Sequence, residues 1–124
     1  MSLVFKILSR DEWKTAEEAG AYRGSADDKR DGFIHLSTSA QLAGTLTRHF
    51  RGAKDLALIA IEADDLGADL KWEEGEHGTF PHLYRALDLK LARWVSTIGD
   101  KGDGVFALPA AAYAEDAAAP GRLS

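Results

Sequence analysis

Short apolar runs and helical patterns alternate through the first half of the chain. Residues Val4–Leu8 form a short run typical of a β-strand. Ser9 and Glu12 follow at the spacing of a capping box, in which each residue's side chain bonds to the other's backbone N–H. This spacing predicts a helix from about residue 10 to residue 19 that ends at Gly20.

A second strand and a second helix are predicted next. Residues 21–31 are polar and indicate a loop, whereas Gly32–Leu36 is typical of a short strand. Thr38 and Gln41 repeat the capping-box spacing and predict a helix that ends near Gly52. Its apolar residues recur at helical spacing: Leu42, Leu46 and Phe50.

The second half of the chain is rich in predicted strands. Leu56–Ile61 is nearly all apolar, which favours a strand covered on both faces at the centre of a sheet. We expect a short strand at Leu70–Glu73, a loop at Glu74–Pro81, and two further strands at Leu91–Ile98 and Val105–Leu108. Two early helices and later strands predict α+β, or mixed α/β, architecture in place of a doubly wound sheet.

Length and composition are those of one small domain. The chain has 124 residues, 45% of them apolar and 28% charged, which predicts a single globular domain over residues 1–109. An alanine-rich tail is expected over residues 110–124. The net charge of −5 disfavours bulk binding of nucleic acid. Because there is no cysteine, no signal-peptide pattern and no long apolar run, we expect a cytoplasmic protein that does not bind membranes.

The first group of candidate residues comes directly after the second predicted strand. Alternation puts Phe33 and His35 on one face of that strand, and Ser37 and Thr38 follow at a helix start. Backbone N–H groups and hydroxyls at such a position suit a phosphate or other polar ligand. The alternative, which the residues alone favour, is that Thr38 only caps the helix and His35 is a structural histidine.

The second group follows the expected loop. His82 and Tyr84 lie in a segment made rigid by Pro81, and such a segment suits the wall of a pocket or a structural turn equally well. Trp72 and Glu73 precede it. A carboxylate beside an indole is a candidate acid–base group if burial raises its pKa, although a glutamate on an edge strand more often points into water.

The other two histidines carry weaker signals. His49, near a helix C-terminus, is explained by the helix dipole alone. His77 lies in a polar loop with Glu74 and Glu76 nearby, and we expect it to be solvated. The spacing of His77 and His82 matches no recognised metal motif, so no metal is expected.

The combined strings DGFIHLST (residues 31–38), Trp72–Glu73 and FPHLY (residues 80–84) resemble domain-of-unknown-function family 952, a family of small bacterial proteins. The resemblance extends from about Val4 to about Leu108. This family in turn looks like a remote relative of the ADP-ribosyltransferase fold, which includes the RNA 2′-phosphotransferases. The resemblance implies a split, strand-rich β-sheet that holds NAD in a cleft.

The same resemblance implies roles for individual residues. His35 would contact the ribose or the amide of NAD, with Ser37 and Thr38 beside it. Tyr84 is the best candidate for stacking on nicotinamide, Trp72 is a further aromatic candidate, and His82 would line the same cleft. In transferases that use a glutamate, this residue follows the aromatic one. Here Glu73 precedes it, which puts transfer activity in question.

We therefore expect a protein that binds NAD or a related nucleotide, with His35, Glu73 and His82 as candidate catalytic residues for ADP-ribosyl or phosphoryl transfer. One alternative is a non-catalytic module that binds a small molecule or a protein. Another is a metal-dependent hydrolase that uses the same three residues. The sequence leaves the acceptor and the choice between monomer and homodimer open.

Overall fold

A computed structural model describes residues 2–102 and 105–113. Within these residues the chain forms three α-helices, nine strands and four short 3₁₀ segments. The α-helices are α1 (Arg10–Ala19), α2 (Ala26–Asp31) and α3 (Leu42–His49). The strands are β1 (Leu3–Ser9), β2 (Ala21–Tyr22), β3 (Ile34–His35), β4 (Leu56–Glu62), β5 (Leu70–Gly75), β6 (Gly78–Leu83), β7 (Leu87–Asp88), β8 (Ala92–Gly102) and β9 (Val105–Ala107). The 3₁₀ segments are η1 (Ser39–Gln41), η2 (Ala63–Asp69), η3 (Leu89–Leu91) and η4 (Ala110–Ala112).

The main sheet is antiparallel and has the strand order β1-β4-β8-β9. Every residue of β4 is buried, because neighbouring strands pair with both of its edges and side chains cover both of its faces. Ala57, Ile59 and Ile61 face one hydrophobic cluster, whereas Leu58 and Ala60 face another. The prediction of a central strand at Leu56–Ile61 is confirmed.

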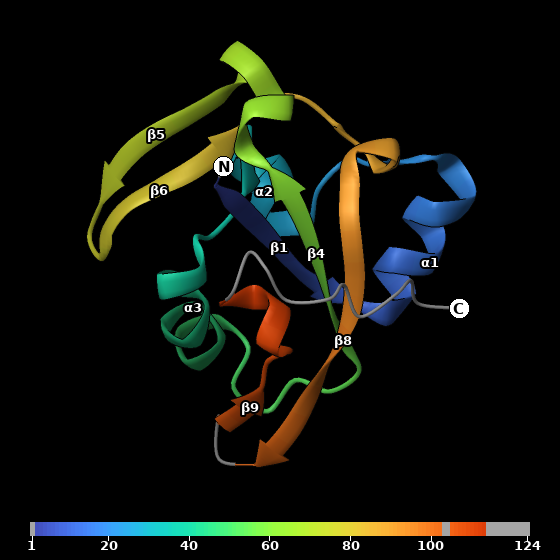
Figure 1. Ribbon diagram of the computed structural model, residues 1–124, viewed down its shortest axis with the longest axis vertical. Helices are drawn as coiled ribbons and strands as arrows, with labels where there is room; N and C mark the ends of the chain where they lie inside the picture. The colour runs from blue at the N-terminus through green and yellow to red at the C-terminus, as the bar shows by residue number, and fades with distance from the viewer. Residues whose placement is uncertain (1, 103–104, 114–124) are drawn as a thin grey trace.

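Helices cover the two faces of this sheet. Figure 1 shows α1 on one side of the central strands and α3 on the other. Trp13 of α1 belongs to the first cluster, and Leu42 and Leu46 of α3 belong to the second. The predicted capping box of α1 is present, with Ser9 Oγ accepting from the Glu12 backbone N–H and Glu12 Oε1 accepting from the Ser9 N–H. The predicted stop at Gly20 is also confirmed, with the glycine in the left-handed conformation at φ 81°.

A second, three-stranded antiparallel sheet has the order β3-β6-β5. The segment Ile34–Ser37 joins it to the main sheet. Ile34 and His35 pair with β6, and Leu36 donates to the Pro81 carbonyl at 3.0 Å. Ser37 then exchanges two backbone hydrogen bonds with Phe5 of β1, at 2.8 and 2.9 Å. His35 and Ser37 therefore lie at the point where the two sheets separate.

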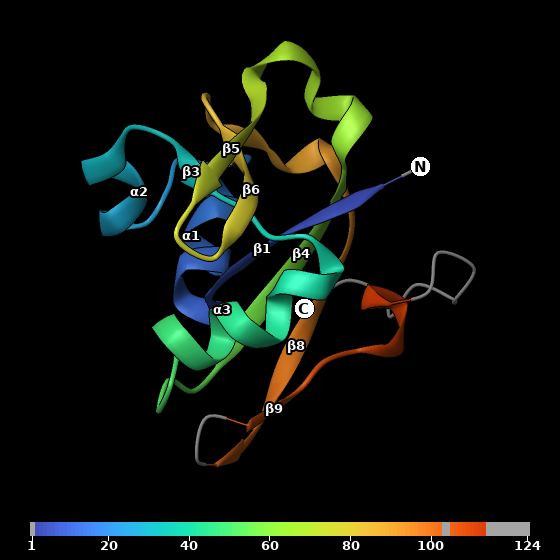
Figure 2. The ribbon, with the colours of Figure 1, turned by 90° about the vertical axis from the view of Figure 1, so that its left-hand side faces the viewer.

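The β5–β6 hairpin projects from the body of the molecule. Figure 2 shows it beside β3, between α2 and α3. A hydrogen bond connects the hairpin to η1, because the Gln41 side chain donates to the Thr79 carbonyl at 2.7 Å. Gln41 Oε1 also accepts from the Thr38 N–H at 3.0 Å, so half of the second predicted capping box is formed as expected.

Mixed α/β architecture is confirmed, but two expected loops are wrong. Residues 21–31 contain strand β2 and helix α2, because Ser25 and Asp28 form a capping box whose aspartate is buried. Residues 74–81 belong to the β5–β6 hairpin, because β3 provides a pairing partner for β6. The first half of the chain consequently holds three α-helices, one more than expected.

The predicted boundary after residue 109 stays a prediction. Ala111 and Ala112 of η4 are buried and belong to the second cluster, whereas residues 114–124 lie outside the described residues. In the part of the chain that the structure describes, no helix has the length and apolar character needed to cross a bilayer.

Candidate functional site

A pocket of about 310 Å³ opens where the two sheets separate. Its walls come from α2, α3, the segment Ile34–Ser37 and the β5–β6 hairpin. The sequence contains four histidines, and all four line this pocket: His35, His49, His77 and His82. We refer to it as the four-histidine pocket.

His35 is held by a buried ion pair beneath it. Its Nδ1 lies 2.6 Å from Asp28 Oδ1, and its backbone N–H donates to the same oxygen at 3.1 Å. The other oxygen of Asp28 accepts from Lys6 Nζ at 2.9 Å and from the Ser25 backbone N–H at 3.0 Å. Lys6 donates also to the His35 carbonyl at 3.1 Å. The side chains of Lys6 and Asp28 are only 7% and 2% exposed.

These contacts determine the charge of Asp28. Burial alone would raise its pKa, but the hydrogen bond from His35 and the charge of Lys6 outweigh burial and hold the pKa well below its ordinary value of 3.8. The carboxylate is therefore ionised. Because an ionised carboxylate only accepts hydrogen bonds, Asp28 keeps a proton on His35 Nδ1 and turns Nε2 toward the pocket. There the carboxylate of Asp31, 3.0 Å from Nε2, requires a second proton on the ring.

A second carboxylate reaches His35 from the end of α2. Asp31 Oδ2 lies 3.0 Å from His35 Nε2, and its side chain is 34% exposed. The Arg30 guanidinium donates to both Asp31 oxygens, from Nε at 3.0 Å and from an Nη at 3.4 Å. The hydrogen bond from Arg30 lowers the pKa of Asp31.

His82 of β6 forms a similar pair with Glu73 of β5, in which the carboxylate is more exposed than Asp28. Its Nδ1 lies 2.9 Å from Glu73 Oε1, which also accepts from the Tyr84 hydroxyl at 2.6 Å. These bonds, from Tyr84 first and then from His82, lower the pKa of Glu73. The hydrogen bond to Glu73 in turn raises the pKa of Tyr84. Of the two alternatives for Glu73, burial beside an indole and exposure on a strand, the structure supports exposure, because the carboxylate has two donors and is 40% exposed.

Phe33 joins the two histidine–carboxylate pairs. Its ring stacks on His82 with the centroids 4.0 Å apart, and it also contacts His35 at 4.6 Å and Tyr84 at 5.2 Å. The two imidazole rings meet edge to face at 5.6 Å. Strand pairing explains this arrangement, because His35 on β3 lies directly opposite His82 on β6.

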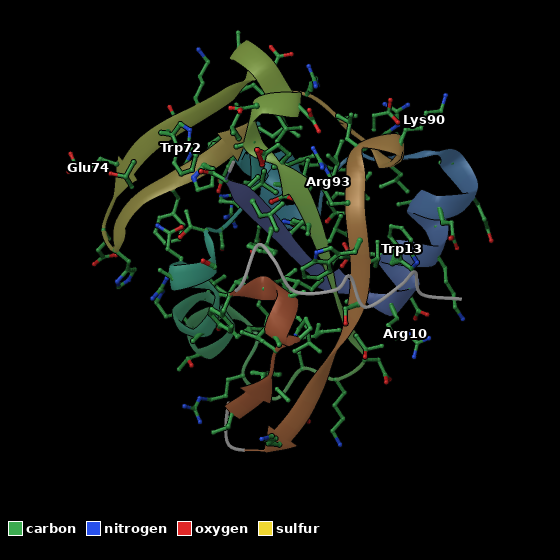
Figure 3. All side chains as sticks on the ribbon, in the orientation of Figure 1. Arg10, Trp13, Trp72, Glu74, Lys90 and Arg93 are labelled. Atoms are coloured by element: carbon green, nitrogen blue, oxygen red, sulfur yellow. The ribbon has the colours of Figure 1, made fainter. Side chains whose placement is uncertain are left out.

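The other predicted site residues are divided between the pocket and its surroundings. Ser37 is buried and lines the pocket, with its hydroxyl 3.2 Å from that of Thr45. Thr38, Glu73, Tyr84 and Trp72 are not among the lining residues. Trp72 is 48% exposed. Figure 3 shows Trp72 and Glu74 on the β5–β6 hairpin. The aromatic rings of the pocket wall are instead those of Phe50 and Phe80.

Sequence analysis missed several polar residues of the pocket. Arg48 and His49 come from the end of α3, and Glu76 and His77 come from the tip of the hairpin. The sequence signal that could have found Asp28 is its spacing of three from Ser25, which is that of a capping box. No local pattern identifies the hairpin residues, since only the fold brings them to α3.

The described residues contain no cluster of three or more histidine, aspartate or glutamate side chains suited to hold a metal ion. In particular, His35, His82 and Glu73 do not form such a cluster. A second cavity of about 350 Å³ lies between α3 and β9, and its lining is mainly apolar, including Leu46, Val105 and Phe106. None of the candidate residues lines it.

Comparisons with known proteins place this geometry in a family. The profile described as "Protein of unknown function (DUF952)" matches residues 7–95. The crystal structure of protein CC0527 from Caulobacter crescentus is similar, with 46% identity, a TM-score of 0.82, and coverage of 85% of this chain and 93% of that one.

The solution NMR structure of the same Caulobacter protein is 47% identical, with a TM-score of 0.75 and coverage of 85% and 91%. No curated protein matches the chain. The matched residues include His35, His82 and both carboxylates that contact their Nδ1 atoms. The chain therefore belongs to the DUF952 family.

Proposed function

We propose that the four-histidine pocket binds NAD or a related nucleotide, with His35, Ser37 and His82 among the residues that contact it. The observation that carries the proposal is that these three residues, which the ADP-ribosyltransferase resemblance singles out, line one pocket although up to 47 positions separate them. Its volume of about 310 Å³ lies within the range of small-molecule sites, at its lower end.

The lining supports a ligand that is both polar and partly flat. Arg48 supplies positive charge that suits a phosphate group. The other two basic residues of the lining are paired with carboxylates, Lys6 with Asp28 and Arg30 with Asp27 and Asp31. The ring of Phe80 offers an apolar surface on which a base or nicotinamide ring can stack. We propose Phe80 for this role in place of Tyr84, because Phe80 is on the pocket wall and the Tyr84 hydroxyl is bonded to Glu73.

The two imidazoles suit acid–base chemistry on such a ligand. Histidine is the side chain that most often transfers protons near neutral pH, and a carboxylate on Nδ1 fixes the ring and its tautomer. Asp28 and Glu73 supply that contact at 2.6 and 2.9 Å. In this proposal, His35 and His82 serve ADP-ribosyl or phosphoryl transfer, and Glu73 acts by positioning His82.

Binding without turnover is the second candidate. It is favoured by the position of Glu73, which does not line the pocket and so does not face a developing positive charge on a bound sugar. The two candidates share the binding site and differ in whether the nicotinamide–ribose bond is broken.

The test is calorimetric titration of the purified protein with NAD, together with the variant His35→Ala. We expect the unchanged protein to bind NAD saturably. We expect His35→Ala to lower the affinity for NAD by about tenfold or more, the typical loss when a polar group that contacts a ligand is removed. Release of nicotinamide, measured by chromatography in the same samples, separates transfer from binding alone.

The control is Arg85→Ala, which removes an exposed ion pair with Asp69 at 2.9 Å, and neither of these two residues lines the pocket. Its NAD affinity should match that of the unchanged protein. Absence of heat at millimolar NAD, or an affinity that His35→Ala leaves unaltered, would overturn the proposal.

A further inference from the structure

The contact between α2 and His35 resembles a bound anion. Asp31 places one carboxylate between the Nε2 atom of His35 and the guanidinium of Arg30. Arg30 approaches it with two donors, as a guanidinium does toward a carboxylate or phosphate. All three side chains line the four-histidine pocket.

We propose that Arg30 and the Nε2–H group of His35 form an oxyanion subsite for a phosphate group of the ligand, and that Asp31 fills this subsite until the ligand displaces it. Asp31 is then an internal competitor that lowers the affinity of the pocket for phosphate. The proposal deepens the proposed function and rests on it in taking the ligand to carry a phosphate.

The carboxylate of Asp31 can move away from His35, whereas that of Asp28 is fixed. It is the last residue of α2, its side chain is about one-third exposed, and rotation of that side chain moves the carboxylate into solvent. Asp28 is buried and has bonds from Lys6, Ser25 and His35. Displacement of Asp31 therefore leaves His35 in place, with Nδ1 still held and Nε2 open to a new acceptor.

The charges around the subsite favour an anion once Asp31 has moved. Asp28 is already neutralised by Lys6 at 2.9 Å. Asp27 remains 3.2 Å from Arg30, but both side chains are largely exposed, so their attraction is weakened by solvent. Arg30 and the imidazole then have one oxyanion position between them without an acceptor.

A second arginine offers the main competing location. Arg48 lines the opposite wall of the pocket, on α3. A phosphate bound there would not compete with Asp31. Arg30 is favoured as the phosphate-binding residue because Arg30 and His35 both contact the same carboxylate, that of Asp31, each at 3.0 Å.

The experiment is a titration with inorganic phosphate, followed by NMR through the side-chain signals of His35 and Arg30, in the unchanged protein and in Asp31→Ala. Asp27→Ala is the matched control, because it removes the same charge from the same helix and the same arginine but does not contact His35. We expect Asp31→Ala to bind phosphate about threefold to fivefold more tightly than either, in line with the loss of one exposed ion-pair competitor. A parallel titration with acetate tells whether a ligand carboxylate is preferred.

An Asp31→Ala affinity equal to or weaker than that of Asp27→Ala would overturn the inference. So would a gain that persists when Arg30→Ala is added to Asp31→Ala, since the phosphate would then bind elsewhere, for example at Arg48. Phosphate binding at His35 in a protein that does not bind NAD would leave the subsite intact and refute the proposed nucleotide.

Discussion

The two histidine–carboxylate pairs of the pocket differ mainly in what lies behind the carboxylate. Asp28, behind His35, is buried and has Lys6 as its counter-ion. Glu73, behind His82, is 40% exposed, and its additional partner is the neutral hydroxyl of Tyr84. Both carboxylates approach Nδ1 at hydrogen-bond distance, so the geometry at the imidazole is similar and the surroundings are not.

This difference determines how much each pair contributes to the stability of the fold. A buried ion pair becomes strongly destabilising when one partner is removed, because the other charge is left without compensation. An exposed pair contributes little to stability, because water replaces the lost partner. The His35 pair is consequently part of the fold, whereas the His82 pair can change with little effect on folding.

The largest expected effect is that of Asp28→Asn. This change leaves the Lys6 ammonium buried without a counter-ion and should lower the free energy of unfolding by about 3–5 kcal/mol. Urea unfolding at pH 7 measures it. Adding Lys6→Met should restore part of the loss, and a loss below about 1 kcal/mol in the single variant would contradict a buried, mutually dependent pair.

The same pair predicts a pH dependence. Because the pKa of Asp28 is lowered in the folded protein, its contribution to stability is present above the ordinary value of 3.8 and is lost as the pH falls from there toward the lowered pKa. The difference in unfolding free energy between the unchanged protein and Asp28→Asn should shrink below pH 3.8. A constant difference down to pH 2 would be inconsistent with this account.

Phe33→Ala tests the connection between the two pairs. The ring contacts His35, His82 and Tyr84, and its removal should cost about 1–2 kcal/mol, since it is only partly buried. The NMR signals of both imidazoles should broaden as they lose a shared neighbour. Signals of His35 that stay unchanged would show that Asp28 alone positions its ring.

Glu73→Gln has the smallest expected effect on stability. It should lower the pKa of Tyr84 toward the ordinary value of 10.0, because the carboxylate that raises it is gone. NMR titration of the Tyr84 ring, with Tyr84→Phe to identify its signals, measures this change. A pKa that stays the same or rises would mean that Glu73 is not the partner of Tyr84 in solution.

Much of the main sheet could be predicted because its signals are local. The six-residue apolar run at Leu56–Ile61 and the Ser9–Glu12 pair each specify an element without knowledge of the rest of the chain. The hairpin could not be predicted in this way. Its strand β6 contains Pro81, which weakens a strand assignment, yet the Pro81 carbonyl still accepts from Leu36, 45 positions away.

The candidate site was predicted in part for the same reason. The alternation that puts Phe33 and His35 on one face is local, and the structure has this arrangement, with Ile34 and Leu36 buried on the other face. The burial of Asp28 depends on Lys6, which is 22 residues away. His49 and His77 line the same pocket as His35 because α3 and the hairpin pack on either side of it. No spacing in the sequence predicts this arrangement.

The most direct test of the central claim is an NMR titration with NAD that follows the imidazole signals of all four histidines. We expect the signals of His35 and His82 to move with one binding curve, with smaller movements at His49 and His77, while signals from Val105 and Phe106 stay in place. Two results would contradict the claim that the four-histidine pocket is the nucleotide site. One is a set of NMR shifts confined to residues of the cavity between α3 and β9, and the other is histidine signals that do not respond to NAD.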